Sequence, residues 1–296
     1  MRIDAELATH DWSRLQGGGL AIAPLFRDKT FMGMTSQITS RPWALILVVL
    51  LLTGRLAFAD EPEKADGGGA AASDPTAAVS FQDLKLRYFD LTEGNEESIL
   101  EAEGSYVFSP AFKLTHRLTG TRTNRSGDWE TDLRELSLKP IYLHPIKPFG
   151  INAKLALGVE WLKDLGKFRD GTGTGADQIA PLIGIGWLLT DDDFVITLVQ
   201  YYHSYDENDG VEDVRTTGPR LIYIRALPSI KGWGKVDLKT SIDHEDDNDF
   251  TQTLELQLGK MISDRIGIYG ETFVGDSVLD TDAYDMGIGI GLRFMY

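Results

Sequence analysis

The sequence ends in GIGIGLRFMY, residues 287–296, where large apolar residues stand at every second position. Up to Phe294, glycine and arginine fill the positions between them. Because successive side chains of a β-strand point to opposite faces, this segment predicts a strand with one apolar face and one small or charged face. The apolar face consists of Ile288, Ile290, Leu292, Phe294 and Tyr296.

The same period of two extends back through the chain to Phe81. Alternation is clear over residues 84–88, 100–108, 112–119, 135–142, 152–161, 235–242 and 251–258. Three further segments, Ile179–Leu189, Phe194–Ser204 and Ile266–Val274, carry large residues on both faces. With residues 216–226 and the final segment, the sequence predicts about twelve strands of roughly ten residues, the length that a tilted strand needs to cross a bilayer.

The connections between these segments alternate in character. The long polar set is Thr92–Ser98, Arg122–Glu130, Lys163–Asp177, Tyr205–Asp213, Asp243–Asp249 and Gly275–Asp282. The short set is Ser109–Ala111, His144–Gly150, Thr190–Asp193, Leu227–Gly232 and Ile262–Asp264. Long outer loops and short periplasmic turns are typical of outer-membrane barrels.

Residues 80–296 are therefore predicted to form one all-β domain, a transmembrane antiparallel up-and-down β-barrel in the bacterial outer membrane. An even strand number places both chain ends on the periplasmic side and the acidic loops outside the cell. The final strand resembles the terminal strand by which bacterial outer-membrane proteins are recognised for insertion. The expected partners are outer-membrane lipid, lipopolysaccharide and the insertion machinery.

The first 59 residues fit a cleaved export signal rather than a domain. Arg41 precedes the apolar run Trp43–Leu52, and Ala57-Phe58-Ala59 supplies an A-x-A cleavage site. A signal peptide of ordinary length would start at Met32 or Met34 rather than at Met1. Residues 60–79 read DEPEKADGGGAAASDPTAAV, and this composition predicts a flexible periplasmic leader.

Composition excludes several kinds of function. The chain has 296 residues, a formal net charge of -16 and no cysteine. Without cysteine there is no disulfide framework, thiolate metal site or cysteine nucleophile. Such an acidic chain does not suit nucleic acid, whose phosphates require Lys and Arg. No cofactor is predicted.

The polar faces of the predicted strands carry both signs of charge. A charged interior requires water or an ordered network of ion pairs, so one interpretation is a water-filled pore and the other is a sealed lumen. The pore predicts passive uptake or efflux of small-molecule solutes, and the sealed lumen predicts a closed structural or surface-interaction barrel. The candidate pore-lining residues are Lys113, Arg117, Glu135, Lys139, Lys154, Glu160, Lys235, Asp237, Lys239, Glu255 and Arg293.

Two loops superficially suggest ligand sites. The acidic loop that starts at Asp243 lacks the features of a calcium loop, because Asn248 replaces the glycine at the sixth position and Leu254 stands at the twelfth. The acidic residues could instead attract cations to a pore, bind divalent ions that bridge lipid headgroups, or be solvated. The glycines of GTGTGAD, residues 171–177, precede a strand rather than a helix, so they predict a flexible loop and not a phosphate site.

The alternative class of function is a lipid-acting barrel enzyme. His203 is the one mature-chain histidine with a serine beside it, Ser204. Adjacent residues of a regular strand point to opposite faces, so this pair does not form a base and nucleophile unless a loop begins there. We therefore expect a non-enzymatic barrel, with His203 at an aromatic boundary between lipid and water.

Four short elements in the second half of the chain are Gln200–Ser204 with its acidic loop, Leu227-Pro228, Gly232-Trp233 and Leu256–Lys260. Together they resemble a family of outer-membrane transporters associated with the MetA pathway of phenol degradation. The resemblance implies a channel or transporter, with small aromatic or hydrophobic molecules as its solutes. It implies no individual functional residue.

Overall fold

The computed structural model describes residues 68–91, 94–208, 211–246, 248–275, 284 and 286–296. The predicted signal peptide, both candidate start positions and residues 60–67 of the leader lie outside the described residues. Within the described part no helix is long and apolar enough to cross a membrane.

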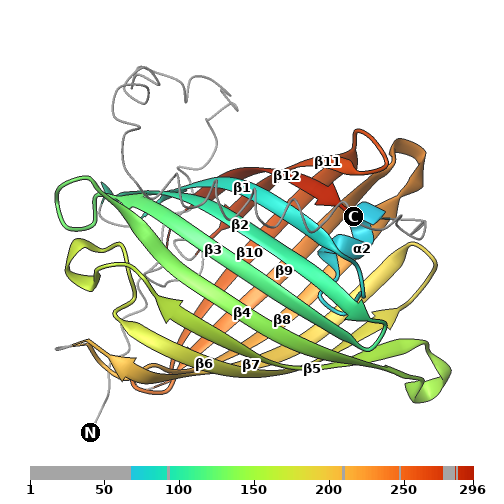
Figure 1. Cartoon of the computed structure of the whole chain (residues 1–296), viewed down its shortest axis with the longest axis horizontal. Coiled ribbons are helices and arrows are strands. Elements are labelled where there is room, and N and C mark those ends of the chain that lie inside the picture. The colour runs from blue at the N-terminus through green and yellow to red at the C-terminus, as the bar shows by residue number, and fades with distance from the viewer. Residues whose placement is uncertain (1–67, 92–93, 209–210, 247, 276–283, 285) are drawn as a thin grey trace, which may run out of the picture. The chain divides into compact units, whose positions relative to one another are not determined.

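Twelve strands form one closed antiparallel barrel, which confirms the predicted fold class (Figure 1). Each strand pairs with its neighbours in the sequence, and β1 pairs with β12 to close the sheet. The strands are β1 Phe81–Asp90, β2 Glu96–Ser109, β3 Phe112–Thr123, β4 Glu130–Ile146, β5 Ala153–Asp164, β6 Ala176–Leu188, β7 Asp193–Glu207, β8 Arg215–Leu227, β9 Gly232–Asp243, β10 Asp249–Met261, β11 Ile266–Val274 and β12 Met286–Met295.

The long and short connections lie at opposite ends of the barrel, as the sequence predicts. We call the end with the short connections the turn end; Phe81 and Met295, at the free ends of the paired strands β1 and β12, also lie there. The opposite end is the loop end. The described parts of the connections contain three short 3-10 helices: η3 Pro148–Gly150 and η5 Pro228–Ile230 at the turn end, and η4 Phe168–Asp170 at the loop end.

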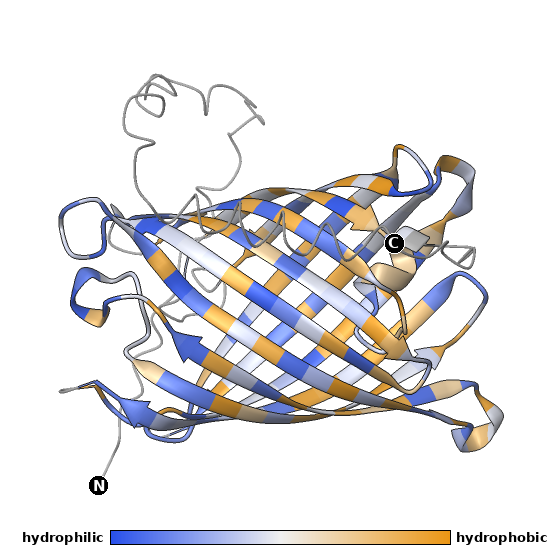
Figure 2. Ribbon diagram, viewed as in Figure 1, coloured by the Kyte–Doolittle hydropathy of each residue, from blue (hydrophilic) through white to orange (hydrophobic). Residues whose placement is uncertain are grey.

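The outer surface of the barrel is apolar. Figure 2 shows the alternation of apolar and polar residues along the strands. On β12 the outward residues Ile288 and Ile290 are 58% and 52% exposed, and every strand contributes similar side chains. An exposed apolar surface of this extent marks a surface covered by protein or lipid. Four residues of the predicted apolar face of β12, Ile288, Ile290, Leu292 and Phe294, are exposed in this way, and β5 exposes Leu157, Val159 and Trp161.

The three segments with large residues on both faces also form strands of this barrel. Ile196 of β7 and Tyr269 of β11 point inward and are buried, whereas Val199 and Ile268 point outward and are exposed. Apolar residues therefore line part of the interior, where a strictly alternating pattern would place polar ones.

The segment before β1 lies within the turn end of the barrel. The sequence predicts a flexible leader over residues 60–79, and the structure differs from this for residues 68–79. Residues Gly68–Ser73 form helix α2, and a turn continues from Asp74 to Ala77. Ala70, Ala72 and Ala77 are buried. Inward apolar side chains of β7, β8, β9 and β11 pack against Ala70, so the apolar interior is the surface that holds the leader.

Candidate functional site

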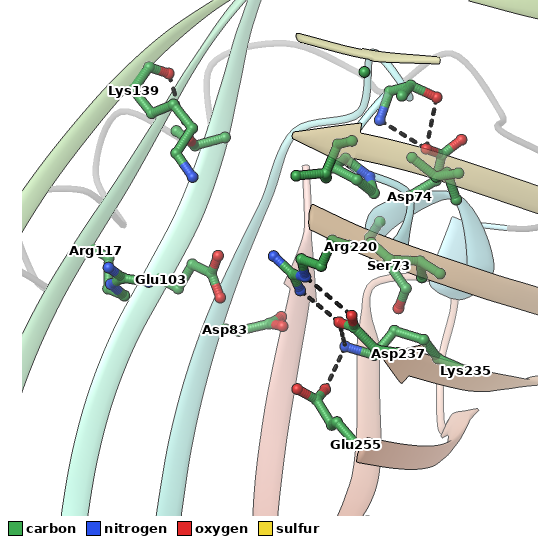
Figure 3. Close-up of a pocket in the computed structure, with 18 of the residues that line it drawn as sticks. Ser73, Asp74, Asp83, Glu103, Arg117, Lys139, Arg220, Lys235, Asp237 and Glu255 are labelled. Atoms are coloured by element: carbon green, nitrogen blue, oxygen red, sulfur yellow. Dashed lines mark hydrogen bonds and ion pairs between the residues drawn. The ribbon is translucent and has the colours of Figure 1, made fainter. Parts of the chain in front are cut away.

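The interior of the barrel, or lumen, brings the predicted pore-lining residues together. A cavity of about 210 Å³ lies within it (Figure 3). Glu135 and Glu160 contact residues of its wall, and Lys154 lies on the inward face of β5 near the turn end. The predicted residues that line the cavity directly are Lys113, Arg117, Lys139, Lys235, Asp237, Lys239, Glu255 and Arg293.

Strands β8 to β10 carry the first group of lumen charges. The guanidinium of Arg220 donates to both carboxylate oxygens of Asp237, at 2.9 Å and 2.5 Å. Lys235 pairs with Asp237 at 3.6 Å and also with Glu255. Lys239 donates to Glu255 at 2.7 Å. Both carboxylates are buried, and each is neutralised by two cations.

Strands β3 to β5 and β7 carry the second group. Glu160 is its centre: Lys139 pairs with it at 2.7 Å and Arg117 at 3.5 Å. Ser137 and Gln200 donate to it at 2.5 Å and 2.6 Å. These four donors satisfy a buried carboxylate that would otherwise be unfavourable.

Strands β1, β2, β11 and β12 carry the third group. Lys85 pairs with Glu101 at 2.7 Å, and Arg87 pairs with Glu271 at 2.9 Å. Arg293 of β12 donates to both oxygens of Asp83 on β1, at 2.9 Å and 2.7 Å. This last pair crosses the strand junction that closes the barrel.

Several lumen residues are missing from the sequence-based candidates. Those on β1 and β2 belong to clearly alternating segments, so the same pattern identifies them once the inward face is known. Arg220 lies in a segment whose faces the sequence left unassigned. The added residues are Asp83, Lys85, Arg87, Glu101, Glu103, Arg220 and Glu271.

Two lumen lysines near the turn end stand apart from these groups. Among the described residues, no carboxylate oxygen lies within 4.0 Å of the ammonium of Lys113 or Lys154. Lys113 is only 2% exposed, and its ammonium donates to the backbone oxygen of Ala77 at 2.7 Å. The leader therefore supplies the hydrogen-bond acceptor for a buried cation of the wall.

The leader has a second anchor across the lumen. Arg293 donates to the backbone oxygen of Gly69 and to the hydroxyl of Ser73, both at 2.7 Å. Gly69 lies so close to the indole ring of Trp233 that a Cβ there would overlap the ring. Because Trp233 and Arg293 lie on β9 and β12 and Lys113 lies on β3, residues 69–77 extend across the lumen.

The loops that suggested ligand sites hold internal contacts instead. Asp164 accepts backbone N–H groups from Gly175 at 2.8 Å and Thr174 at 3.3 Å, so amides of the glycine-rich loop bind a carboxylate of this chain. In the acidic loop after β9, Glu245 pairs with Arg215 at 3.0 Å. No cluster of three or more metal-ligating side chains occurs among the described residues.

His203 and Ser204 lie within β7, directly before a β-bulge at Tyr205, and point to opposite faces. His203 is exposed on the outer surface, and Ser204 is buried, where its hydroxyl accepts the N–H of Val214 at 2.8 Å. A loop does not begin at His203, so the geometry that an adjacent base and nucleophile would need is not formed.

Comparison with known proteins identifies the fold. No protein-family model and no curated protein matches the chain. An outer membrane channel from Pseudomonas putida F1 is 12% identical, with a TM-score of 0.57 over 80% of this chain and 100% of the channel. The NanC porin is 12% identical, with a TM-score of 0.52 over 73% of this chain and 100% of the porin. At this identity the likeness shows that the chain has the fold of outer-membrane barrels.

Proposed function

We propose that the protein is a channel of the bacterial outer membrane for passive movement of small molecules, and that its leader closes it at the turn end. The observation that carries this proposal is a charged, cavity-containing lumen inside an apolar outer surface. Polar walls of both signs suit an aqueous path. Proteins of the same fold include a channel and a porin, which is consistent with this role.

The proposal places the turn end in the periplasm and the acidic loops outside the cell. Both ends of a bacterial single-chain barrel lie on the periplasmic side, and its longer loops are extracellular. Residues 1–59 would then serve as the export signal, with Met32 or Met34 as the start, and residues 60–79 would enter the lumen from the periplasm. Lipid and lipopolysaccharide would contact the outer surface, and the insertion machinery would bind the strand that ends at Tyr296.

The finer assignment to transporters associated with the MetA pathway of phenol degradation rests on the sequence elements alone. Gln200 of the element Gln200–Ser204 hydrogen-bonds to Glu160 in the lumen wall, and Trp233 of the element Gly232-Trp233 packs against the leader. Both elements thus contribute to the lumen, which supports a transport role for them. We propose no solute from this resemblance.

A permanently closed barrel is the second candidate. It is favoured by the seated leader and by the ion pairs that hold most lumen charges. The two candidates differ in whether the leader leaves the lumen. The opposite orientations of His203 and Ser204 give no support to a lipid-acting enzyme.

Single-channel recording in planar bilayers tests the channel. We expect the refolded full-length chain to show brief openings, because the leader must leave for ions to pass. In a salt gradient we expect Glu255→Gln to shift the reversal potential toward anions, since the substitution leaves Lys235 and Lys239 without their shared carboxylate. Glu212→Gln, in an exposed loop, is the matched control. Complete absence of openings from the folded barrel under all voltages would contradict the channel.

The outer surface makes a separate prediction about stability. Leu256 points outward from the middle of β10 and is 42% exposed. Leu256→Arg should lower the free energy of unfolding in lipid vesicles by about 2–4 kcal/mol, because the charge enters the hydrocarbon layer. Gln252→Arg, on the same face nearer the loop end, should change it by about 0–1 kcal/mol. Equal effects from the two variants would show that this surface does not lie in a bilayer.

A further inference from the structure

We call the part of the lumen at the turn end, where residues 69–77 lie, the turn-end chamber. Its wall combines apolar side chains with cationic hydrogen-bond donors. Ile196, Ile222 and Ile224 are almost completely buried on one side of it, beside Trp233 and Tyr269. On the other side, Ala78 packs against a second apolar group that contains Leu143. The remaining lumen is lined mainly by ion pairs, so the apolar wall is concentrated at the turn end.

The cations of this chamber are arranged for an acceptor from outside the wall. Lys113 is buried and donates to the leader, and Lys154 faces the same end. Arg293 pairs with Asp83 through two nitrogens and directs its third, Nη1, to the leader. If the leader left, Lys113 would be an unpartnered cation beside an apolar surface, which is unfavourable unless an anion replaced the leader.

The leader itself brings a carboxylate to the cavity. Asp74 is 8% exposed and lines the cavity with Lys113 and Arg293. Its oxygen Oδ1 accepts the N–H and the hydroxyl of Thr76, both at 2.7 Å. The native occupant of the chamber is therefore a short apolar segment that carries one carboxylate.

The composition of the leader indicates that it binds only weakly to the wall of the chamber. Its buried apolar side chains are the alanines Ala70, Ala72 and Ala77, which bury little area. A six-residue helix that begins with two glycines has little stability of its own, and ordering glycine is entropically unfavourable. An occupant with a larger apolar body would bury more surface against the same wall.

We infer that the turn-end chamber is a binding site for a small amphipathic monocarboxylate, and that residues 69–77 are an internal occupant which this solute displaces. The apolar body would pack on Trp233 and the isoleucines, and the carboxylate would accept from Lys113. The inference rests on the proposed channel, since the solute would reach the chamber through the lumen.

Equilibrium dialysis of the full-length chain with octanoate tests the site, with 1-octanol as the neutral probe and empty micelles subtracted. Gly69→Leu removes the internal occupant without altering the wall, because its side chain overlaps Trp233. We expect Gly69→Leu to tighten octanoate binding about tenfold or more, because the state in which the leader has left the chamber is no longer a minor population. Gly270→Leu, on the exposed outer face of β11, is the matched control.

A second substitution tests the charge. In the Gly69→Leu background, Lys113→Met should weaken octanoate binding about tenfold, the usual loss for a charge-assisted hydrogen bond, and leave octanol within about twofold. Heat-modifiable gel mobility confirms that each variant is folded. If Gly69→Leu does not fold, Ala70→Arg serves in its place, because Ala70 belongs to the leader and is buried against the wall.

The outcomes separate this site from the channel. If Lys113→Met weakens octanoate binding and octanol binding equally, the chamber does not recognise a carboxylate and the proposed site is wrong. The site is also wrong if the folded Gly69→Leu variant shows no saturable binding of octanoate. If the barrel conducts ions but does not bind octanoate, the proposed site is wrong and the proposed channel stands. Selective octanoate binding in a barrel that never conducts would support the site and remove the channel.

Discussion

Substitution of Gly69 by leucine should raise the fraction of time that the channel is open by about 30-fold in planar bilayers. A Cβ at this position would overlap the Trp233 ring, and Met261 closes the space beside it. Overpacking of a tight contact costs about 2 kcal/mol, which corresponds to about 30-fold in an equilibrium. The leader's two anchors, at Arg293 and Lys113, would then be lost together.

The matched substitution Gly270→Leu should leave the open fraction unchanged, because its Cβ would meet only a backbone oxygen at 3.9 Å. An unchanged open fraction in a folded Gly69→Leu barrel would show that the leader does not control the path. The permanently closed barrel would then be the better description.

Asp83→Ala should lower the free energy of unfolding by about 3 kcal/mol, the usual effect of removing one partner from a buried ion pair. Asp83 is 1% exposed, and it accepts from two nitrogens of Arg293 and from the hydroxyl of Tyr269 at 2.9 Å. The substitution leaves Arg293 charged among the rings of Trp233, Tyr269 and Phe81, with its centre about 5 Å from each.

Unfolding of the refolded barrel by guanidinium chloride in lipid vesicles measures this effect. Asp90→Ala, at the exposed end of the same strand, is the control. The double variant Asp83→Ala/Arg293→Leu should regain part of the stability, because it also removes the buried charge that Asp83→Ala leaves without a partner. A loss below about 1 kcal/mol for Asp83→Ala would mean that lumen water solvates Arg293, as it does exposed pairs.

The fold could be predicted from the sequence because its determinants are local. Most strands show on their own which face is apolar, and β12 is the plainest case: glycines 287, 289 and 291 point inward and isoleucines 288 and 290 point outward. The lumen residues follow from the same alternation, so Lys235, Asp237 and Lys239 could be grouped before their partners were known. Their pairing with Arg220 could not, because it depends on the neighbouring strand.

The leader could not be predicted because its position depends on distant residues. Nothing in the run Gly68–Ser73 distinguishes a seated helix from a flexible linker, and its apolar content is alanine. The relevant signal lay elsewhere, in the inward apolar residues of β7, β8 and β11. Ile196, Ile222 and Tyr269 broke the expected polar face, and their partner was a segment more than a hundred residues earlier.

The pairing of Asp83 with Arg293 links closure of the barrel to binding of the leader. These residues stand opposite each other in the pair of strands, β1 and β12, that closes the barrel. Arg293 also donates a hydrogen bond to the leader, which immediately precedes β1. The anchor for the leader is therefore complete only when the barrel closes, so a nascent barrel would be sealed at the moment it becomes continuous. A barrel that closes in this way would enter the membrane with its lumen already occupied by the leader.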